Sequence, residues 1–102
     1  MERREAYPTD TQHIVNLSGY VWAASRIPEL GRLRVLDLAC GTGYGSDYLS
    51  GKADRVVGVL CAPQIVARNR ALYRHSAASF LAMDGCALGF LDESFDCILS
   101  QD

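Results

Sequence analysis

The hydrophobic positions of the chain fall into short continuous runs, separated by stretches in which they recur with helical spacing. A short apolar run bounded by turn-forming residues is typical of a strand that is buried on both faces. Such runs lie at 33–38, 55–60, 79–82 and 95–100. We expect four strands and, because they have no polar face, we expect cover on both sides of the sheet that they form.

The first helical pattern precedes the first strand. It must end before Pro28, since the residue preceding a proline avoids helical geometry. Its apolar stripe consists of Ile14, Leu17, Val21, Ala24 and Ile27. Tyr20 and Trp22 flank this stripe. We expect both to pack as core aromatics, and the alternative is a place in the wall of a pocket.

Two further helices follow the first and second strands. Residues 46–50 predict a short helix, and Pro63 fits the first turn of a longer one. The predicted inner face of the longer helix is Ile65, Val66, Asn69, Leu72 and Tyr73. Its outward-pointing arginines, which we expect to form a solvated surface rather than an anion-binding patch, are Arg68, Arg70 and Arg74. Strands that alternate with helices predict an α/β fold with a parallel sheet, and right-handed crossovers place the second and third strands on one side of the first.

Composition narrows the class of protein. The 102 residues suffice for a single domain, with a helical segment at 1–30 and a βαβ core at 31–102. A formal net charge of −2 gives no electrostatic footprint for nucleic acid or an anionic membrane. No apolar run reaches membrane-spanning length and the first residues form no signal peptide, so a soluble cytoplasmic protein is the default expectation.

The cysteines make no C-x-x-C pair, and each lies in an apolar or loop context. They are Cys40, Cys61, Cys86 and Cys97. We therefore expect free, buried thiols rather than disulfides or metal ligands.

The candidate chemistry lies directly after the first strand. Glycines follow at alternate positions (Gly41, Gly43 and Gly45), and a short helix comes next. A strand, a glycine loop and a helix N-terminus together are typical of a nucleotide-type site, whereas a tight turn alone needs only one glycine. Asp37 ends the buried strand, where an unpaired carboxylate is costly, so we expect it to be bonded to a ligand or to the loop.

These residues resemble a known family. The run Val35–Gly45 is similar to the first motif of class I S-adenosylmethionine (SAM)-dependent methyltransferases, and Leu81–Gly85 and Phe95–Asp96 resemble the later motifs. The resemblance covers about residues 33–102. It implies a Rossmann-like parallel sheet of order 3-2-1-4, truncated relative to the seven strands of the family.

The resemblance also implies roles toward SAM. Asp37 is expected to hold the methionine end, mostly through water and the loop, and Ser100 to lie near that end. Asp84 is expected to accept a bond from the adenine amino group, with the backbone of Gly85 beside the ring; a turn role for Asp84 is the alternative. Asp96 is expected to order the strand entrance. The residues expected to offer backbone at close approach to the methionine and ribose are Ala39, Gly41 and Gly43.

Leu60 and Cys61, at the end of the second strand, are also expected to lie beside the cofactor, but they depart from the family's pattern. The family normally has an acid at the position of Leu60, where it binds the ribose hydroxyls, and a leucine side chain cannot accept a hydrogen bond. No acceptor-binding or general-base residue can be assigned, because the family places most of them after the fourth strand.

The leading hypothesis is methyl transfer from SAM, with this chain supplying the cofactor-binding half and with a small-molecule acceptor favoured over a macromolecule. An alternative is a non-catalytic fragment or association module, since the fourth strand is expected to be an exposed edge that invites self-association. An NAD(P)-binding domain is disfavoured, because the third glycine of its motif is displaced and the later acid is missing.

Overall fold

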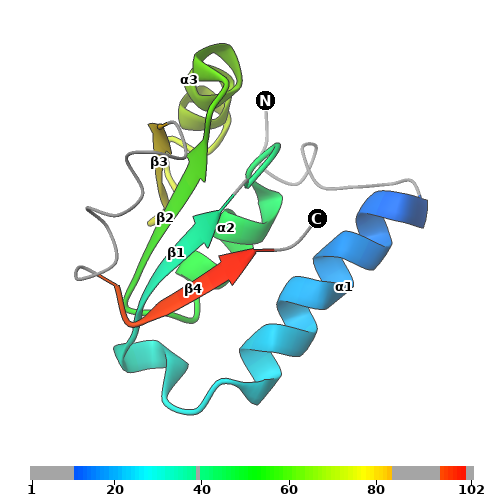
Figure 1. Ribbon diagram of the computed structural model, residues 1–102, viewed down its shortest axis with the longest axis vertical. Coiled ribbons are helices and arrows are strands. Elements are labelled where there is room, and N and C mark those ends of the chain that lie inside the picture. The colour runs from blue at the N-terminus through cyan, green and yellow to red at the C-terminus, as the bar shows by residue number, and fades with distance from the viewer. Residues whose placement is uncertain (1–10, 39, 84–94, 101–102) are drawn as a thin grey trace.

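The structure, a computed structural model, describes residues 11–38, 40–83 and 95–100. It is an α/β sandwich of one sheet and one helical layer (Figure 1). The helices are α1 (Thr11–Arg26), α2 (Tyr44–Ser50) and α3 (Pro63–Leu72), with a 3-10 turn at Leu30–Arg32. The strands are β1 (Arg34–Leu38), β2 (Arg55–Leu60), β3 (Ser79–Ala82) and β4 (Cys97–Ser100).

The sheet is parallel throughout and has the order β3-β2-β1-β4, which confirms the predicted Rossmann-like topology. In its register Leu38 is paired with both Val59 and Ser100, so the carboxyl ends of β1, β2 and β4 are level. The strand order reverses between β1 and β4. In open α/β sheets this carboxyl edge, at the reversal, is where ligands bind.

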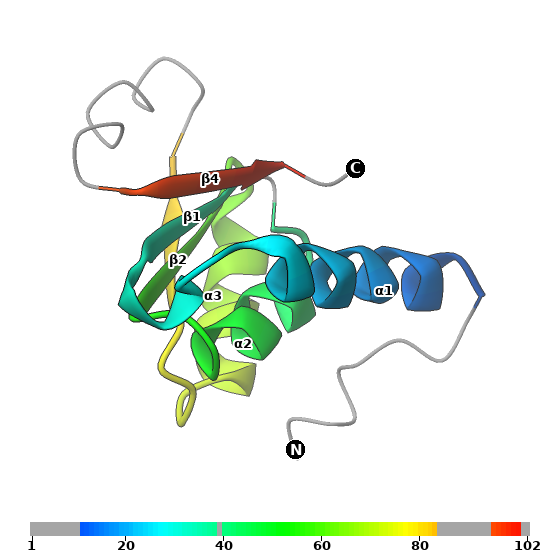
Figure 2. The same cartoon turned by 90° about the horizontal axis from the view of Figure 1, so that it is seen from below.

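All three described helices lie on one face of the sheet, as Figure 2 shows. The predicted cover is found on both faces, because Leu36 and Val57 on the opposite face are buried as well, but the described helices supply it on one face only. The reason is topological: β1, β2 and β3 follow one another in one direction, and successive right-handed crossovers then place α2 and α3 on the same side. Helix α1 packs beside α2 on that side.

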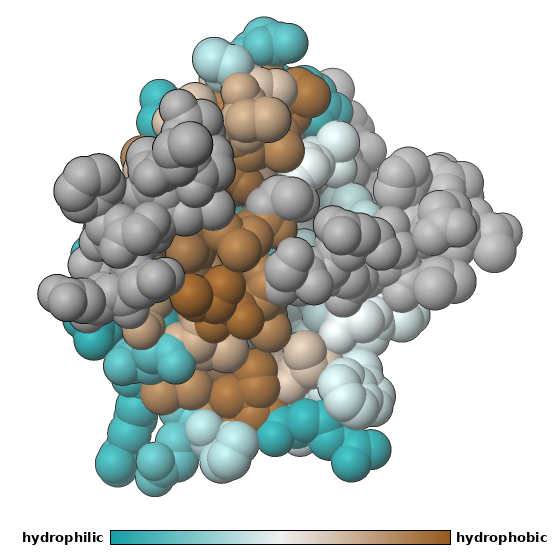
Figure 3. All heavy atoms as spheres, viewed as in Figure 1, coloured by the Kyte–Doolittle hydropathy of each residue, from teal (hydrophilic) through white to brown (hydrophobic). Residues whose placement is uncertain are grey.

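The strand side chains divide between the two faces. Val35 and Val56 pack on the helices, whereas Leu36 and Val57 belong to a separate apolar cluster on the opposite face. The other members of that cluster are Val59, Leu38, Leu81, Met83 and Phe95. A hydrophobic strip runs down the middle of this face in Figure 3.

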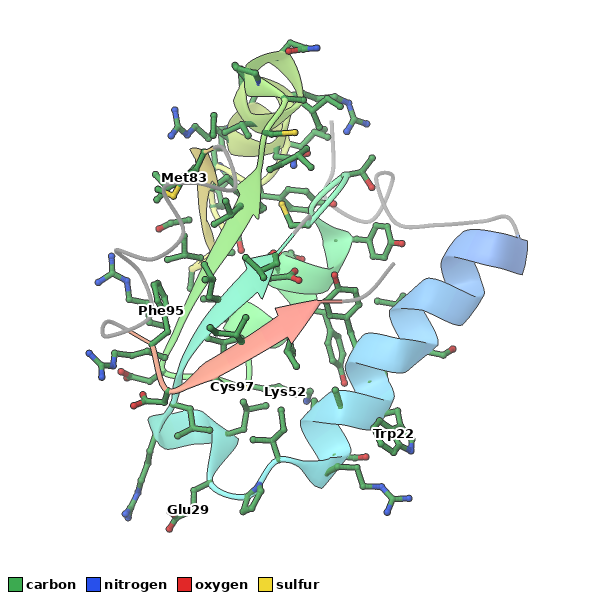
Figure 4. All side chains as sticks on the ribbon, in the orientation of Figure 1. Trp22, Glu29, Lys52, Met83, Phe95 and Cys97 are labelled. Carbon is green, nitrogen blue, oxygen red and sulfur yellow. The ribbon has the colours of Figure 1, made fainter. Side chains whose placement is uncertain are left out.

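Helix α1 turns most of its predicted stripe to the core: Leu17, Ala24 and Ile27 pack there, and Tyr20 is a core aromatic as predicted. Tyr20 is buried, whereas Trp22 is 61% exposed and points away from the sheet (Figure 4). The Arg26 Cζ lies 5.2 Å from the centre of the Trp22 ring. Val21, predicted to face the core, is also exposed. The predictions for Trp22 and Val21 were wrong because the helix turns Tyr20 inward, over the backbone of Gly45, where a Cβ would collide with the tyrosine ring.

The outer face of α3 is solvated as predicted. The outward arginines are exposed, and Arg70 Nε donates to the carbonyl of Phe80 on the edge strand β3 at 2.9 Å. Asp96 accepts bonds from the backbone N–H of Arg34 at 2.9 Å and from its guanidinium, which orders the entrance to β4 as expected. In the portion of the chain that the structure describes, no helix has both the length and the apolarity to cross a membrane.

Candidate functional site

The glycine loop connects β1 to α2 at the carboxyl edge of the sheet. Gly41 has a φ of 58° and Gly43 a φ of 88°, a region that residues with a Cβ rarely adopt. The loop is tied down by backbone bonds: Cys40 N–H donates to the carbonyl of Val59 on β2, and Gly43 N–H donates to the carbonyl of Cys40, each at 3.1 Å. The Gly43 carbonyl then accepts from Asp47 N–H at 3.0 Å in the first turn of α2.

The two glycines have different surroundings. A Cβ at Gly41 would meet none of the described atoms within 4 Å, so this position faces open space at the carboxyl edge of the described chain. A Cβ at Gly43 would lie 2.9 Å from the ring of Tyr73 and 3.1 Å from that of Phe80. Gly43 is thus required by core packing as well as by its φ, and Gly41 is the position where a ligand can come close to the backbone.

Asp37 lies beneath this loop and is fully buried. Tyr20 Oη donates to its Oδ1 at 3.1 Å, and Ser46 Oγ donates to its Oδ2 at 2.7 Å. The expected role toward SAM stays a prediction. The carboxylate is bonded to α1 on one side and to α2 on the other, so any effect on a ligand passes through these two hydroxyls and the loop.

Burial raises the pKa of the Asp37 carboxyl to about 6, against the bonds from Ser46 and Tyr20, which lower it. The carboxylate is therefore mostly ionised at neutral pH. Burial and the nearby Asp37 raise the pKa of the Cys40 thiol to about 12, so that this thiol remains protonated and unreactive.

The cysteine prediction holds in part. Cys40, Cys61 and Cys97 are free thiols, but only Cys40 is buried; Cys97 is partly buried and Cys61 is exposed. Cys86 lies outside the described residues.

At the end of β2, the side chain of Leu60 gives this edge an apolar surface. Leu60 is partly buried and packs against the cluster formed under α3 by Cys40, Val66, Tyr73, Ala78 and Phe80. Its carbonyl accepts from Met83 N–H at 3.1 Å, which ties the end of β3 to the same edge. Cys61 follows as an exposed residue.

The structure thus brings together Asp37, Gly41, Gly43 and Leu60 at one edge, with Ser100 on β4 opposite Leu38. Ala39, Asp84 and Gly85 lie outside the described residues, so their predicted roles stay predictions. The described residues include no group of histidines, cysteines and acids that could hold a metal ion.

Three residues of the site were not assigned to it from the sequence. Tyr20 and Ser46 bond Asp37, and Asn69 bonds the glycine loop. For Asn69 a signal existed, because it is a polar residue on a helix face that was otherwise predicted to be apolar. Tyr20 was predicted as a core aromatic with a pocket wall as the alternative, but nothing in the sequence pointed from Tyr20 or Ser46 to the Asp37 carboxylate, because it lies in another element.

A family model described as a methyltransferase domain matches residues 35–102, more than half of the chain. The chain therefore belongs to the methyltransferase domain family, and its fold is that of the amino-terminal half of class I SAM-dependent methyltransferases. This agrees with the resemblance seen in the motifs.

Two solved structures and one sequence relative illustrate the similarity. A SAM-dependent methyltransferase from Mesorhizobium loti is 31% identical, with a TM-score of 0.66, over 82% of this chain and 40% of that chain. Magnesium protoporphyrin IX methyltransferase from Synechocystis, solved with bound SAM, is 17% identical, with a TM-score of 0.73, over 95% of this chain and 52% of that chain. At that identity the likeness shows the fold alone.

An uncharacterized protein of Synechococcus sp. is 52% identical over 33 residues, which are 32% of this chain and 8% of that protein. The chain thus spans about half or less of the length of each of these relatives.

Proposed function

We propose that this chain binds SAM at the carboxyl edge of its sheet and serves as the cofactor-binding part of a methyltransferase. The observation that carries the proposal is the glycine loop after β1. It lies where the strand order reverses, and Gly41 there has open space in place of a side chain.

The described residues offer a place for the methionine end of SAM and for its adenosine. The methionine end would lie against the open side of Gly41, near the ends of β1 and β4, where Leu38 and Ser100 are paired. The adenosine would extend over the end of β2, where Leu60 supplies an apolar surface. Leu60 offers no acceptor for the ribose hydroxyls, so we expect affinity to be weaker than a carboxylate at this position would give.

When bound, SAM supplies an activated methyl group. This chain's contribution is to bind and orient it: the loop fixes the backbone near Gly41, and the buried Asp37 joins α1 and α2 beneath that loop. Catalysis in such a site depends mainly on positioning of the acceptor. We propose a small-molecule acceptor, supported only by the absence of excess positive charge in the sequence.

Calorimetric titration of the 102-residue chain with SAM, S-adenosylhomocysteine and NAD tests the proposal. Saturable binding of the first two without binding of NAD is the expected result. Binding of NAD alone, or of none of the three, would overturn it. A Gly41→Ala chain is the matched control, because its added Cβ enters the proposed ligand space and meets no atom of the described residues within 4 Å.

A second candidate function is association through β4. Within the described residues β4 pairs only with β1, and Ile98 on it is 45% exposed. Unpaired strand edges with apolar side chains favour pairing between chains. Sedimentation at increasing concentration should show a rising average mass, and Ile98→Lys should suppress that rise; a concentration-independent monomer would contradict this candidate.

A further inference from the structure

Asn69 is a buried polar residue on the helix that packs beside the glycine loop. Its side chain is fully buried on the inner face of α3, one turn from Val66 and one turn from Tyr73, which are buried too. A buried amide is costly unless its groups are hydrogen-bonded, so its contacts show what it is there to do.

The amide bonds the loop at Gly41 and lies beside the Cβ position of Gly43, the two glycines that have positive φ. Asn69 Nδ2 donates to the carbonyl of Gly41 at 2.8 Å. The Asn69 Cγ lies only 3.2 Å from the point where a Cβ at Gly43 would be. The side chain is therefore held between α3 and the loop, and its NH₂ group must face the loop because a carbonyl can only accept.

The other half of the amide has no matching contact. Among the described atoms Asn69 Oδ1 is buried without a hydrogen-bond partner. An apolar side chain of similar size would avoid that cost, but it could not bind the Gly41 carbonyl. The presence of an amide here is thus explained by the loop contact and not by packing.

The bond to the Gly41 carbonyl determines how the following peptide is oriented. In a planar trans peptide the C=O and N–H groups point to opposite sides. Because the Gly41 carbonyl points to α3, the N–H of Thr42 points away from α3. Thr42 is exposed, and the Cβ position of Gly41 beside it is open. The Thr42 N–H is thereby directed outward from the loop at the carboxyl edge.

We propose that Asn69 is a positioning residue for the cofactor: by holding the Gly41 carbonyl it keeps the Gly41–Thr42 peptide turned so that the Thr42 N–H faces an acceptor atom of bound SAM. The inference rests on the proposed function, and it assigns a determinant of affinity to α3, outside the motif that resembles the family. Without this bond, the freedom of glycine at position 41 allows the peptide to rotate.

The test compares Asn69→Leu with Val66→Ala. Both change a buried side chain on the same face of α3, but Val66 packs in the apolar cluster under the helix. Two quantities are measured well below the unfolding transition: the dissociation constant for S-adenosylhomocysteine, and hydrogen exchange at the Gly43 N–H, which is bonded to the Cys40 carbonyl. Asn69→Ala replaces Asn69→Leu if the leucine does not fold.

We expect the Asn69 variant to bind at least about tenfold more weakly and to exchange faster at Gly43 in the absence of ligand. Val66→Ala should lose stability but keep both quantities near the parent values. The inference would be overturned if the Asn69 variant kept the parent's affinity for S-adenosylhomocysteine and its exchange rate at Gly43. It would also be overturned if Val66→Ala changed both quantities as much as the Asn69 variant does. If the parent chain binds neither SAM nor S-adenosylhomocysteine, the proposed function fails and the role toward the cofactor fails with it; exchange at Gly43 still decides separately whether Asn69 holds the loop.

Discussion

The hydroxyl of Tyr20 donates to Oδ1 of Asp37 at 3.1 Å, and this bond joins helix α1 to the end of the central strand β1. The two residues are 17 positions apart, and both are buried. With Ser46 on the other oxygen, the carboxylate connects two helices below the glycine loop. Docking of α1 and the geometry of the candidate site therefore depend on the same side chain.

Tyr20→Phe tests this connection. It removes one donor and leaves Asp37 Oδ1 buried without that partner, so we expect the free energy of unfolding at neutral pH to fall by about 1–3 kcal/mol. Tyr48→Phe is the control: Tyr48 is on α2, only partly buried, and its ring lies beside Lys52. Its loss should be below about 0.5 kcal/mol in the same denaturant titration. Equal losses would show that the hydroxyl bond to Asp37 contributes nothing specific.

The pKa of Asp37 predicts a pH dependence of stability. It is about 6 in the folded chain against 3.8 for an ordinary aspartate, because burial disfavours the charged form. The folded state therefore binds a proton more readily than the unfolded chain between these values. Stability should fall as the pH rises from about 4 to about 6 and change little from this source above about 7; the total is on the order of 3 kcal/mol.

Asp37→Asn should remove that slope, since it has no proton to lose. Free energies of unfolding measured for both chains between about pH 4 and pH 7 give the difference. Asp96 has a lowered pKa from its bonds to Arg34, so it stabilises at higher pH and acts in the opposite direction. Its contribution is common to both chains and cancels. Parallel curves for the two chains would contradict the predicted burial effect at Asp37.

Alanine at the two loop glycines should separate ligand contact from packing. Gly41→Ala puts a Cβ into open space, so we expect only the cost of its positive φ, about 1–2 kcal/mol, with at least tenfold weaker binding of SAM. Gly43→Ala adds a collision with Tyr73 and Phe80, so it should lose the more stability of the two. Measurements are the free energy of unfolding and the calorimetric dissociation constant. Normal binding by Gly41→Ala would remove this loop from the proposed site.

Leu60→Asp should tighten binding of SAM and of S-adenosylhomocysteine alike. A carboxylate at the end of β2 could accept bonds from the ribose hydroxyls, each such bond contributing about 1.5–3 kcal/mol, which corresponds to roughly tenfold to a hundredfold in affinity. Because Leu60 packs against the cluster under α3, stability should fall. Leu60→Ala is the matched control, as it loses the same packing and gains no acceptor. Unchanged or weaker affinity in Leu60→Asp would mean that the ribose lies elsewhere.

Local patterns were sufficient for much of the fold. Strands β2 and β3 have the predicted bounds, and β1 begins one residue later and β4 two residues later than predicted. The start of β4 is shifted because Asp96 turns its side chain to Arg34 and bonds it before the strand begins. Glycine spacing after an apolar run likewise located the loop at Gly41 and Gly43, where φ is positive. Gly45 lies instead in α2, which begins at Tyr44, two residues earlier than predicted.

The choice between Tyr20 and Val21 for the inner face of α1 could not be derived in the same way. Periodicity placed Leu17, Ala24 and Ile27 on the buried side correctly, but it put Val21 between them where the structure has Tyr20. What decides it is the hydroxyl of Tyr20, whose partner is on β1. For Asn69 the sequence showed a polar residue on the inner face of a helix, but not its acceptor, which lies 28 positions away. Contacts between elements complete the site, and they become visible only once the elements are placed.

The bond from Arg70 to the Phe80 carbonyl also makes the two margins of the sheet unequal. On β3 a guanidinium already occupies an acceptor that an added strand would need, whereas β4 has a described neighbour on one side only. Among the described strands, β4 is therefore the one at which we expect a further strand to add. If two copies of this chain join at β4, the pairing of β4 with β4 relates them by a two-fold axis and uses that margin of both. A contact of this kind then forms a closed pair, which adds no third chain through β4.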